Sequence, residues 1–306
     1  CMSHRQLEQL EAGTYEVLID STLAPGSLSY GEYYLPGETS DEILLTAHIC
    51  HPSLANDNLS GIGVLTYLAK ALQTRNCRYS YRFLFIPGTI GSITWLAHHR
   101  NELHNIRGGL VASLLGDAGA FTYKKSRRGD TELDRLVTQL LRDSGAPHRV
   151  IDFFPYGYDE RQFCSPGFNL PVGNLTRSQY GAYPEYHTSA DDLNLITAEN
   201  LEGAYELYLK IVEGLEANRR YLNRFPYGEP QLGRRGLYDA IGGDSDSKEL
   251  QMAMLWILNL SDGGNSLLDI AERSGCRFEL IEKMATILTE KGLLQEVGEQ
   301  VSVNQK

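Results

Sequence analysis

Short apolar runs alternate with segments of helical periodicity along the first two thirds of the chain. The clearest run, Ile43–His48, stops before Pro52 and is typical of a buried strand, and a helix is expected over Leu59–Leu72. Further strands are predicted at Thr14–Ser21, Ser29–Leu35, Tyr79–Ile86, Gly109–Leu115, Phe121–Ser126, Arg149–Phe154 and Leu170–Thr176, and further helices at Thr89–Asn101, Thr131–Ser144 and Thr197–Tyr221. This alternation predicts an α/β domain with a mixed, mainly parallel sheet and helices on both faces.

A second, smaller unit follows a stretch rich in proline and glycine. Beyond that stretch, three helices and a hairpin are predicted at Lys248–Leu260, Ser266–Ser274, Arg277–Lys291 and Gly292–Val303. Three helices and a wing indicate a winged helix-turn-helix domain. We therefore expect an α/β domain over residues 1–223, a linker over residues 224–247 and a winged-helix domain over residues 248–306.

The charge of the chain bears on its partners. The formal net charge is -11, which argues against a nucleic-acid-binding surface spread over the protein. The helix that would enter a DNA groove, Arg277–Lys291, carries three glutamates against three basic residues. Neutralisation of phosphates supplies most non-specific DNA affinity. We therefore expect no nucleic-acid partner and assign the winged helix a structural or dimerising role, which leaves a homo-oligomer open.

The remaining composition indicates a compartment. No apolar run is long enough to span a membrane, and the polar first residues do not form a signal peptide. The five cysteines are scattered and odd in number, which indicates free thiols in a reducing environment. We expect a cytoplasmic protein without a membrane partner. The start Cys1-Met2-Ser3 is unusual, and we expect an expression remnant or a longer parent whose N-terminal part is absent.

Two histidines and an acid lie close together after the strand Ile43–His48. His48 ends the strand, His51 follows three residues on, and Asp57 precedes the next helix. Ligands bind at the carboxyl ends of strands in open α/β sheets, and His and Asp are ligand types that Zn²⁺ prefers. A structural histidine and a helix N-cap are the ordinary alternatives. The combination within ten positions favours a metal site.

Three further polar residues are expected near the same sheet edge. Asp117 follows a buried strand, although a turn role before Gly119 competes with a ligand role. His187 lies in the loop before the long helix and has no capping role there. Glu160 lies in a loop dense in aromatic residues, where a solvated surface charge is the alternative interpretation.

Two segments carry a more specific signal: residues 55–61, with the sequence ANDNLSG, and residues 187–191, with the sequence HTSAD. Together with His48 they resemble the M28-type zinc exopeptidases, and the match extends over most of residues 14–220. With the trailing winged helix, the chain is similar to bacterial aminopeptidase-like proteins of unknown function, some of them tied by name to polysaccharide biosynthesis. The resemblance implies a zinc exopeptidase-like fold with zinc ligands at His48, Asp57 (the bridging carboxylate), Asp117 and His187.

This chain departs from that pattern in two places. The Glu-Glu pair of the family should fall just after the strand Tyr81–Ile86, where Gly88-Thr89 stands instead. One of the two acids is normally the general base, and the other is a ligand of a second metal. Cys50 replaces the Asp that normally follows the first histidine by two residues. We therefore expect one zinc ion, leave a second open with His51 as its candidate ligand, and name Glu160 as the substitute base.

The sequence thus predicts a zinc-dependent, aminopeptidase-type hydrolase that cleaves an amide bond of a small peptide or an aminoacyl compound. Arg161, Arg177 and Tyr186 are candidate substrate-binding residues, and Asp191 either orients His187 or caps a helix. A catalytically impaired metal- or ligand-binding descendant is one alternative, because loss of the base typically removes about 10²–10⁴-fold in rate. A regulator that reads DNA through the winged helix is the other.

Overall fold

The computed structural model describes residues 2–237 and 246–298 of the chain. Its larger sheet has seven strands in the order β1-β3-β2-β4-β7-β5-β6. The strands are β1 (Gly31–Leu35), β2 (Glu42–His48), β3 (Ser80–Ile86), β4 (Ile106–Ala112), β5 (Phe121–Lys124), β6 (His148–Ile151) and β7 (Val172–Thr176). The four strands β3, β2, β4 and β7 run parallel, whereas β1 is antiparallel to β3 and β5 is antiparallel to β7. The predicted mixed, mainly parallel sheet is confirmed.

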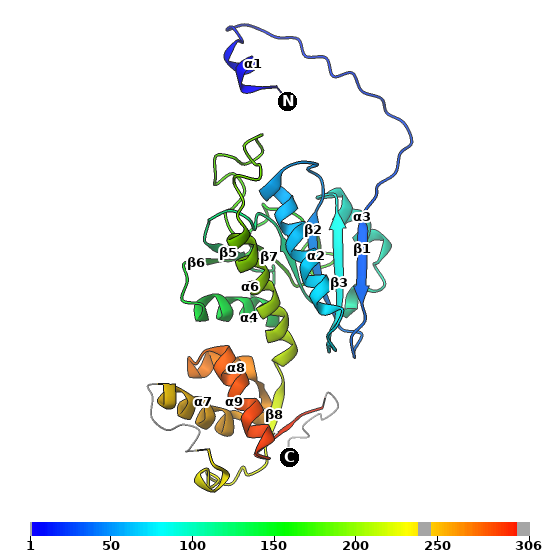
Figure 1. Ribbon diagram of the computed structural model, residues 1–306. Coiled ribbons are helices and arrows are strands. Elements are labelled where there is room, and N and C mark those ends of the chain that lie inside the picture. Colours follow the sequence, from blue (N-terminus) through cyan, green and yellow to red (C-terminus); the bar gives the residue numbers. More distant parts are fainter. Residues whose placement is uncertain (1, 238–245, 299–306) are drawn as a thin grey trace.

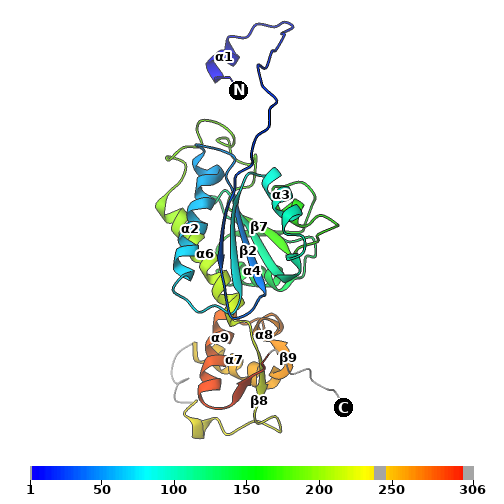
Figure 2. The same ribbon diagram turned by 90° about the vertical axis from the view of Figure 1, so that its right-hand side faces the viewer.

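Helices cover both faces of this sheet (Figures 1 and 2). The helices of this unit are η1 (Ala55–Ser60), α2 (Gly61–Leu72), α3 (Ile90–His98), η2 (Leu103–Asn105), α4 (Glu132–Asp143), α5 (Glu160–Phe163) and α6 (Ala198–Ala217). The short helix α1 (His4–Glu8) lies apart from the sheet, beyond an extended segment (Figure 1). One core packs Leu65, Leu136 and Tyr208 of α2, α4 and α6 against the sheet, and a second packs Trp95 of α3 with Phe163 of α5. All seven residues of β2 are buried, as a parallel strand covered on both faces requires.

The smaller unit is a winged helix, as predicted. Its sheet has the order β10-β8-β9. Its elements are β8 (Arg220–Asn223), η3 (Gly233–Arg235), α7 (Asp246–Leu260), β9 (Asp262–Ser266), α8 (Leu267–Ser274), α9 (Phe278–Glu290) and β10 (Leu294–Glu296). Helices α8 and α9 face the larger unit and contact α4, and α9 also contacts α6. The winged helix therefore presents its helix-turn-helix to the rest of the chain (Figure 1).

Two predicted elements are wrong. Residues 14–21 form no strand: Val17, Leu18 and Ile19 are 78%, 91% and 80% exposed in an extended segment that leads away from the sheet (Figure 1). Alternation of apolar residues does not make a strand without a partner to supply hydrogen bonds. The helix predicted to reach Tyr221 ends at Ala217, because Arg220–Asn223 pairs with β9 and β10 of the second sheet.

Other boundaries differ in detail. Strand β4 begins three residues before its predicted start and ends at Ala112, after which Leu114 has a φ of 54° that takes the chain out of the sheet. A single turn of helix, α5, lies within the predicted loop after Pro155. Part of the predicted linker, residues 238–245, and the distal part of the predicted hairpin, residues 299–303, lie outside the described residues. Among the described residues, no helix combines the length and apolar character needed to cross a bilayer.

Candidate metal centre

Four predicted ligands come from segments that end at one edge of the sheet. His48 is the last residue of β2, Asp57 lies in the helical turn η1, Asp117 follows β4, and His187 lies in the loop before α6. Because β2 and β4 are parallel neighbours, their carboxyl ends meet at this edge.

Asp57 is the centre of the arrangement. Its Oδ1 lies 2.6 Å from His48 Nε2, and its Oδ2 lies 3.1 Å from His187 Nε2 and 3.7 Å from His51 Nε2. The carboxylate and His48 are buried, whereas His51 and His187 are partly open to solvent. The structure therefore gathers three imidazoles around one buried carboxylate.

Two groups of side chains in the described part of the chain lie close enough together to hold a metal ion. One is His51, Asp57 and His187, and the other is His48, Cys50 and His51; in each group the ligand atoms all lie within 4.8 Å of one another. Because His51 belongs to both groups, we treat the five residues as one centre, the His–Cys–Asp cluster. Its nitrogen, oxygen and sulfur donors are those that Zn²⁺ takes, so the residues present fit the metal that the sequence predicts.

The surroundings set the protonation of the two buried members. Burial lowers the pKa of His48, and the hydrogen bond and negative charge of Asp57 only partly offset this. Burial alone would raise the pKa of Asp57, but the hydrogen bond with His48 and the three nearby imidazoles outweigh it and lower the pKa. A neutral imidazole and an ionised carboxylate are the forms in which these groups bind a metal.

Backbone contacts fix the segment that carries Asp57. Asp191 accepts hydrogen bonds from the backbone N–H groups of Asn56 (2.6 Å) and Asp57 (3.0 Å). Asn58 donates to the carbonyl oxygen of Ala112 at the end of β4 (2.9 Å). These bonds of Asp191 go to the Asp57 segment, and none links it to His187 among the described residues.

The loop that carries His187 is also unusual. His187 has a φ of 56°, a conformation that non-glycine residues rarely adopt and that recurs at functional sites. Tyr186 stacks on the imidazole of His187, with ring centroids 4.1 Å apart. Tyr186, a predicted substrate-binding residue, therefore lies directly beside the cluster.

Asp117 is near the centre but belongs to neither group of candidate ligands. Its Oδ2 accepts a hydrogen bond from Asn56 Nδ2 (2.8 Å), and its Oδ1 accepts from Ser178 Oγ (2.7 Å) and the backbone N–H of Gly119 (2.6 Å). Both oxygens thus already bind the protein. Its contacts support the segment before Asp57, and a ligand role for Asp117 stays a prediction.

Glu160, the predicted base, is fully buried at the start of α5. Lys124 Nζ lies 2.5 Å from its Oε1, Asn174 Nδ2 donates to Oε2 (3.2 Å), and the backbone N–H of Tyr158 donates to both oxygens. These contacts describe a buried ion pair that fixes the loop. The role of Glu160 as the base stays a prediction.

A substrate-binding role for Arg161 and Arg177 stays a prediction. Arg177 donates to the carbonyl oxygens of Gly119 (3.1 Å) and Asn200 (3.0 Å), and burial lowers its pKa. It therefore ties β7 to the start of α6. Arg161 has a buried Nε without a hydrogen-bond partner among the described residues.

Tyr158 fills the place where the missing acids were expected. A Cβ atom built on Gly88 would lie 2.2 Å from Cε1 of the Tyr158 ring, so the ring excludes any side chain at that position. The same ring lies 4.0 Å from the His48 ring, and its hydroxyl is 2.7 Å from Cys50 Sγ. Gly88 and Cys50, the two departures from the family pattern, therefore both contact the Tyr158 side chain. The sequence showed them only as two separate replacements of acidic residues.

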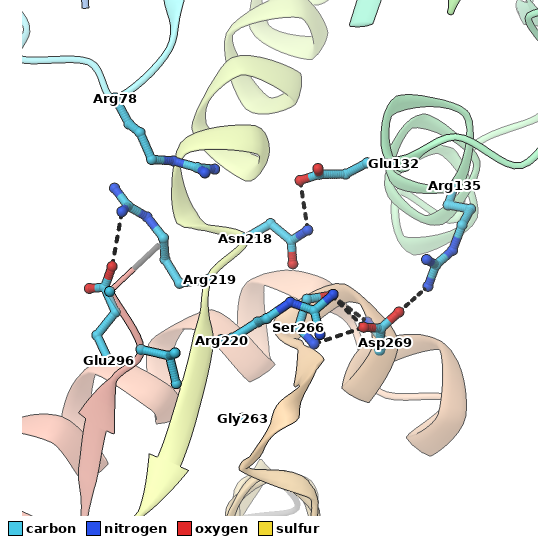
Figure 3. A pocket seen from close by; sticks show the side chains of 12 residues that line it. Arg78, Glu132, Arg135, Asn218, Arg219, Arg220, Gly263, Ser266, Asp269 and Glu296 are labelled. Atoms are coloured by element: carbon cyan, nitrogen blue, oxygen red, sulfur yellow. Dashed lines mark hydrogen bonds and ion pairs between the residues drawn. The ribbon is translucent and has the colours of Figure 1, made fainter. Parts of the chain in front are cut away.

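A separate cleft of about 640 Å³ lies between the two units of the chain (Figure 3). Its arginines are largely occupied: Arg135 pairs with Asp269 (2.6 Å), and Arg219 pairs with Glu296 (2.9 Å). Asn218 bridges the units, since it donates to Glu132 (2.7 Å) and accepts from the backbone N–H of Leu268 (2.9 Å). This cleft is a polar junction and is distinct from the His–Cys–Asp cluster.

The fold and the cluster place the chain in the class of aminopeptidase-like α/β proteins, here joined to a winged helix. Residues 6–218 match the family described as a domain of unknown function, DUF4910, and residues 219–296 match a winged helix-turn-helix family. The chain belongs to the DUF4910 family.

Individual relatives agree with this membership. A Clostridium acetobutylicum protein named for polysaccharide biosynthesis and an aminopeptidase-like domain is 52% identical over 296 residues, which are 97% of this chain and 68% of that protein. A crystal structure of a candidate peptidase from the same organism matches with a TM-score of 0.86 and 50% identity, over 97% of this chain and 67% of that one.

More distant structures share the fold alone. A zinc aminopeptidase from Bacillus subtilis has a TM-score of 0.52 and 21% identity, over 61% of this chain and 49% of that one. A Porphyromonas gingivalis glutaminyl cyclase also has a TM-score of 0.52, with 17% identity over 60% of this chain and 75% of that one. Since proteins named for two different reactions share the fold, the fold does not specify the reaction.

Proposed function

We propose that this chain is a zinc-dependent hydrolase of aminopeptidase type, acting on an amide bond of a small peptide or an aminoacyl compound. The observation that carries the proposal is the convergence on Asp57 of three imidazoles from separate segments, His48, His51 and His187. The left-handed backbone of His187 supports it, because strain of this kind persists where function requires it.

The cluster would hold one Zn²⁺ ion. When bound, zinc supplies Lewis acidity that polarises a carbonyl group and lowers the pKa of water to about 7. Asp57 stays ionised between the imidazoles, and His51 and His187 remain accessible from solvent. Tyr186, stacked on His187, forms one wall for a substrate. The assignment of Glu160 as the proton carrier stays a prediction, and its buried pair with Lys124 argues for a structural role.

The name of the Clostridium relative widens the range of substrates to test. That protein is named for polysaccharide biosynthesis, so a substrate panel should include aminoacylated and N-acylated sugars beside aminoacyl amides.

Zinc affinity and turnover test the proposal together. We expect Asp57→Asn to bind zinc at least about tenfold more weakly, since it removes the charged ligand at the centre of the cluster, and to lose turnover of aminoacyl chromogenic amides. Chelator competition measures the affinity. Asp152→Asn, a change at an exposed carboxylate, should match the wild type. Equal zinc affinity in Asp57→Asn and the wild type would remove the site assignment.

A non-catalytic metal-binding descendant is the second candidate. It is favoured by the Tyr158 ring, which closes the position of the expected acids, and by the buried pairing of Glu160. Tight zinc binding without turnover on the whole amide panel would establish this alternative.

DNA recognition by the winged helix has less support. The N-terminus of α9 is held by the larger unit, since the backbone N–H of Phe278 donates to Asp143 of α4 (2.7 Å). Burial and the negative charges of Glu213 and Glu279 raise the pKa of Glu282 on the same helix. An acidic helix docked on its own chain does not offer the positive surface that DNA phosphates require. A salt-dependent gel shift would reverse this conclusion.

A further inference from the structure

We propose that Cys50 is a ligand of the metal centre, so that the cluster binds its cation partly through a thiolate. This inference rests on the metal-dependent function proposed above and specifies its coordination. The observation that carries it is the group His48, Cys50 and His51, whose ligand atoms lie within 4.8 Å of one another beside Asp57.

The spacing of this group suits three of the four ligands of a tetrahedral cation. Zn–N distances of about 2.0–2.1 Å and a Zn–S distance of about 2.3 Å place tetrahedral ligands roughly 3.3–3.6 Å apart. Closing from within 4.8 Å to that spacing needs movements of about 1 Å. Cys50 is exposed and His51 is only partly buried, so both side chains have room to move.

The position of the Tyr158 ring explains why the donor beside His48 is a sulfur atom. The Tyr158 ring lies against His48 and excludes a side chain at position 88, so no carboxylate can approach His48 from that position. The Tyr158 hydroxyl lies 2.7 Å from Cys50 Sγ and holds the thiol beside the imidazoles. Tyr158 therefore has two effects: its ring occupies the space of a side chain at position 88, and its hydroxyl positions the Cys50 thiol.

A sulfur ligand also selects the metal. Thiolates favour soft or borderline cations such as Zn²⁺, Co²⁺ and Cd²⁺ over the hard cations Mg²⁺ and Ca²⁺. Binding converts the Cys50 thiol to a thiolate and releases one proton to solvent. We therefore expect the centre to prefer Zn²⁺ and to ignore Mg²⁺ at similar concentrations.

Titration of the metal-free protein with Co²⁺ alone, and in parallel with Cd²⁺ alone, tests the assignment by spectroscopy. We expect an ultraviolet sulfur-to-metal charge-transfer band, at shorter wavelength for Cd²⁺ than for Co²⁺, that saturates with metal binding in the wild type. Cys50→Ser should lose the band and bind Co²⁺ at least about tenfold more weakly. Cys276→Ser, which changes a partly buried thiol of the winged helix, should keep both the band and the affinity.

A second measurement does not depend on any variant. Bound Zn²⁺ should slow alkylation of Cys50 in the wild type at least about tenfold, as read by peptide mass mapping, because a metal-bound sulfur is no longer a free nucleophile. Cys77, a free cysteine remote in sequence from the cluster, should react at the same rate with and without zinc.

The outcomes separate this inference from the proposed function. Metal binding and amide turnover without a charge-transfer band would overturn the role of Cys50 and leave the hydrolase in place. A band lost only in Cys50→Ser, without turnover on any amide, would support the thiolate ligand and overturn the hydrolase. Absence of metal binding in the wild type would overturn both.

Discussion

Asp159 illustrates how burial can shift the pKa of a single residue of this chain. Its side chain is inaccessible to solvent, and Ser92 Oγ donates to its Oδ1 (2.7 Å), whereas its Oδ2 has no partner among the described residues. Burial raises its pKa to about 7, although the hydrogen bond from Ser92 opposes the shift. Sequence reasoning passed over this residue, because nothing in the sequence distinguishes a buried loop acid from an exposed one.

The shift of Asp159 makes stability depend on pH. The unfolded pKa of an aspartate is about 3.9, so the folded state binds the proton more tightly, and the free energy of unfolding falls as pH rises from about 4 to 7. Asp159→Asn mimics the protonated form and should remove this pH dependence, which amounts to roughly 2.5 kcal/mol between pH 5 and pH 8. Urea unfolding at both pH values measures it. Asp130→Asn, at an exposed acid, should retain the wild-type slope, and parallel profiles for all three proteins would contradict the prediction.

At the scale of elements, the contact between Tyr158 and the β3–α3 turn controls what position 88 can hold. Gly88→Ala would bring a methyl group against the Tyr158 ring, and such overpacking typically costs about 1–3 kcal/mol. In a Tyr158→Ala background the same change should cost much less, because the obstructing ring is gone. A double-mutant cycle in urea unfolding measures this coupling.

The control for this cycle is Gly63→Ala in α2. No atom lies within 4 Å of a Cβ built there, so alanine should be neutral or stabilising by up to about 1 kcal/mol, as expected in an exposed helix. If Gly88→Ala were equally harmless, or if its cost were unchanged by Tyr158→Ala, the proposed exclusion would be wrong.

Helices and strands that show a clear hydrophobic pattern in their own sequence were predicted well. Strands that form only because a distant segment pairs with them were not. The buried run of β2 and the amphipathic face of α4 carry their own signal. Arg220–Asn223 is a strand only because β9 and β10 pair with it, which no short window of sequence reveals. Residues 14–21 show the reverse case, a strand-like pattern without a partner.

Some residues of the candidate site could be predicted from the sequence, whereas the contacts between distant segments could not. His48, His51, Asp57 and His187 could be named from strand ends and motif spacing, and the structure brings them together. The positions of Cys50 and Tyr158 relative to each other depend on two segments 108 residues apart, so no sequence spacing predicted their contact. The buried partners of Asp117 and Glu160 were equally invisible, because a carboxylate in a loop does not show which donors will reach it.

At the scale of the whole molecule, Asn218 holds the winged helix to the α/β unit. Asn218→Ala would leave the backbone N–H of Leu268 without its partner at a buried position, which typically costs about 1–3 kcal/mol. We expect a lower free energy of unfolding by that amount, measured in urea. Asn76→Ala, at an exposed asparagine, should be nearly neutral. A similar small effect in both variants would show that the junction depends on other contacts.

The segment 187–191 has two tasks in this architecture. One end supplies the imidazole of His187, and the other end supplies the Asp191 carboxylate that grips the backbone of Asn56 and Asp57. In the proposed metal centre, a single proteolytic cut within this segment would separate the His187 imidazole from the Asp191 carboxylate that holds Asn56 and Asp57. We therefore expect such a cut to weaken metal binding, because it would displace His187 and the Asp57 segment at the same time.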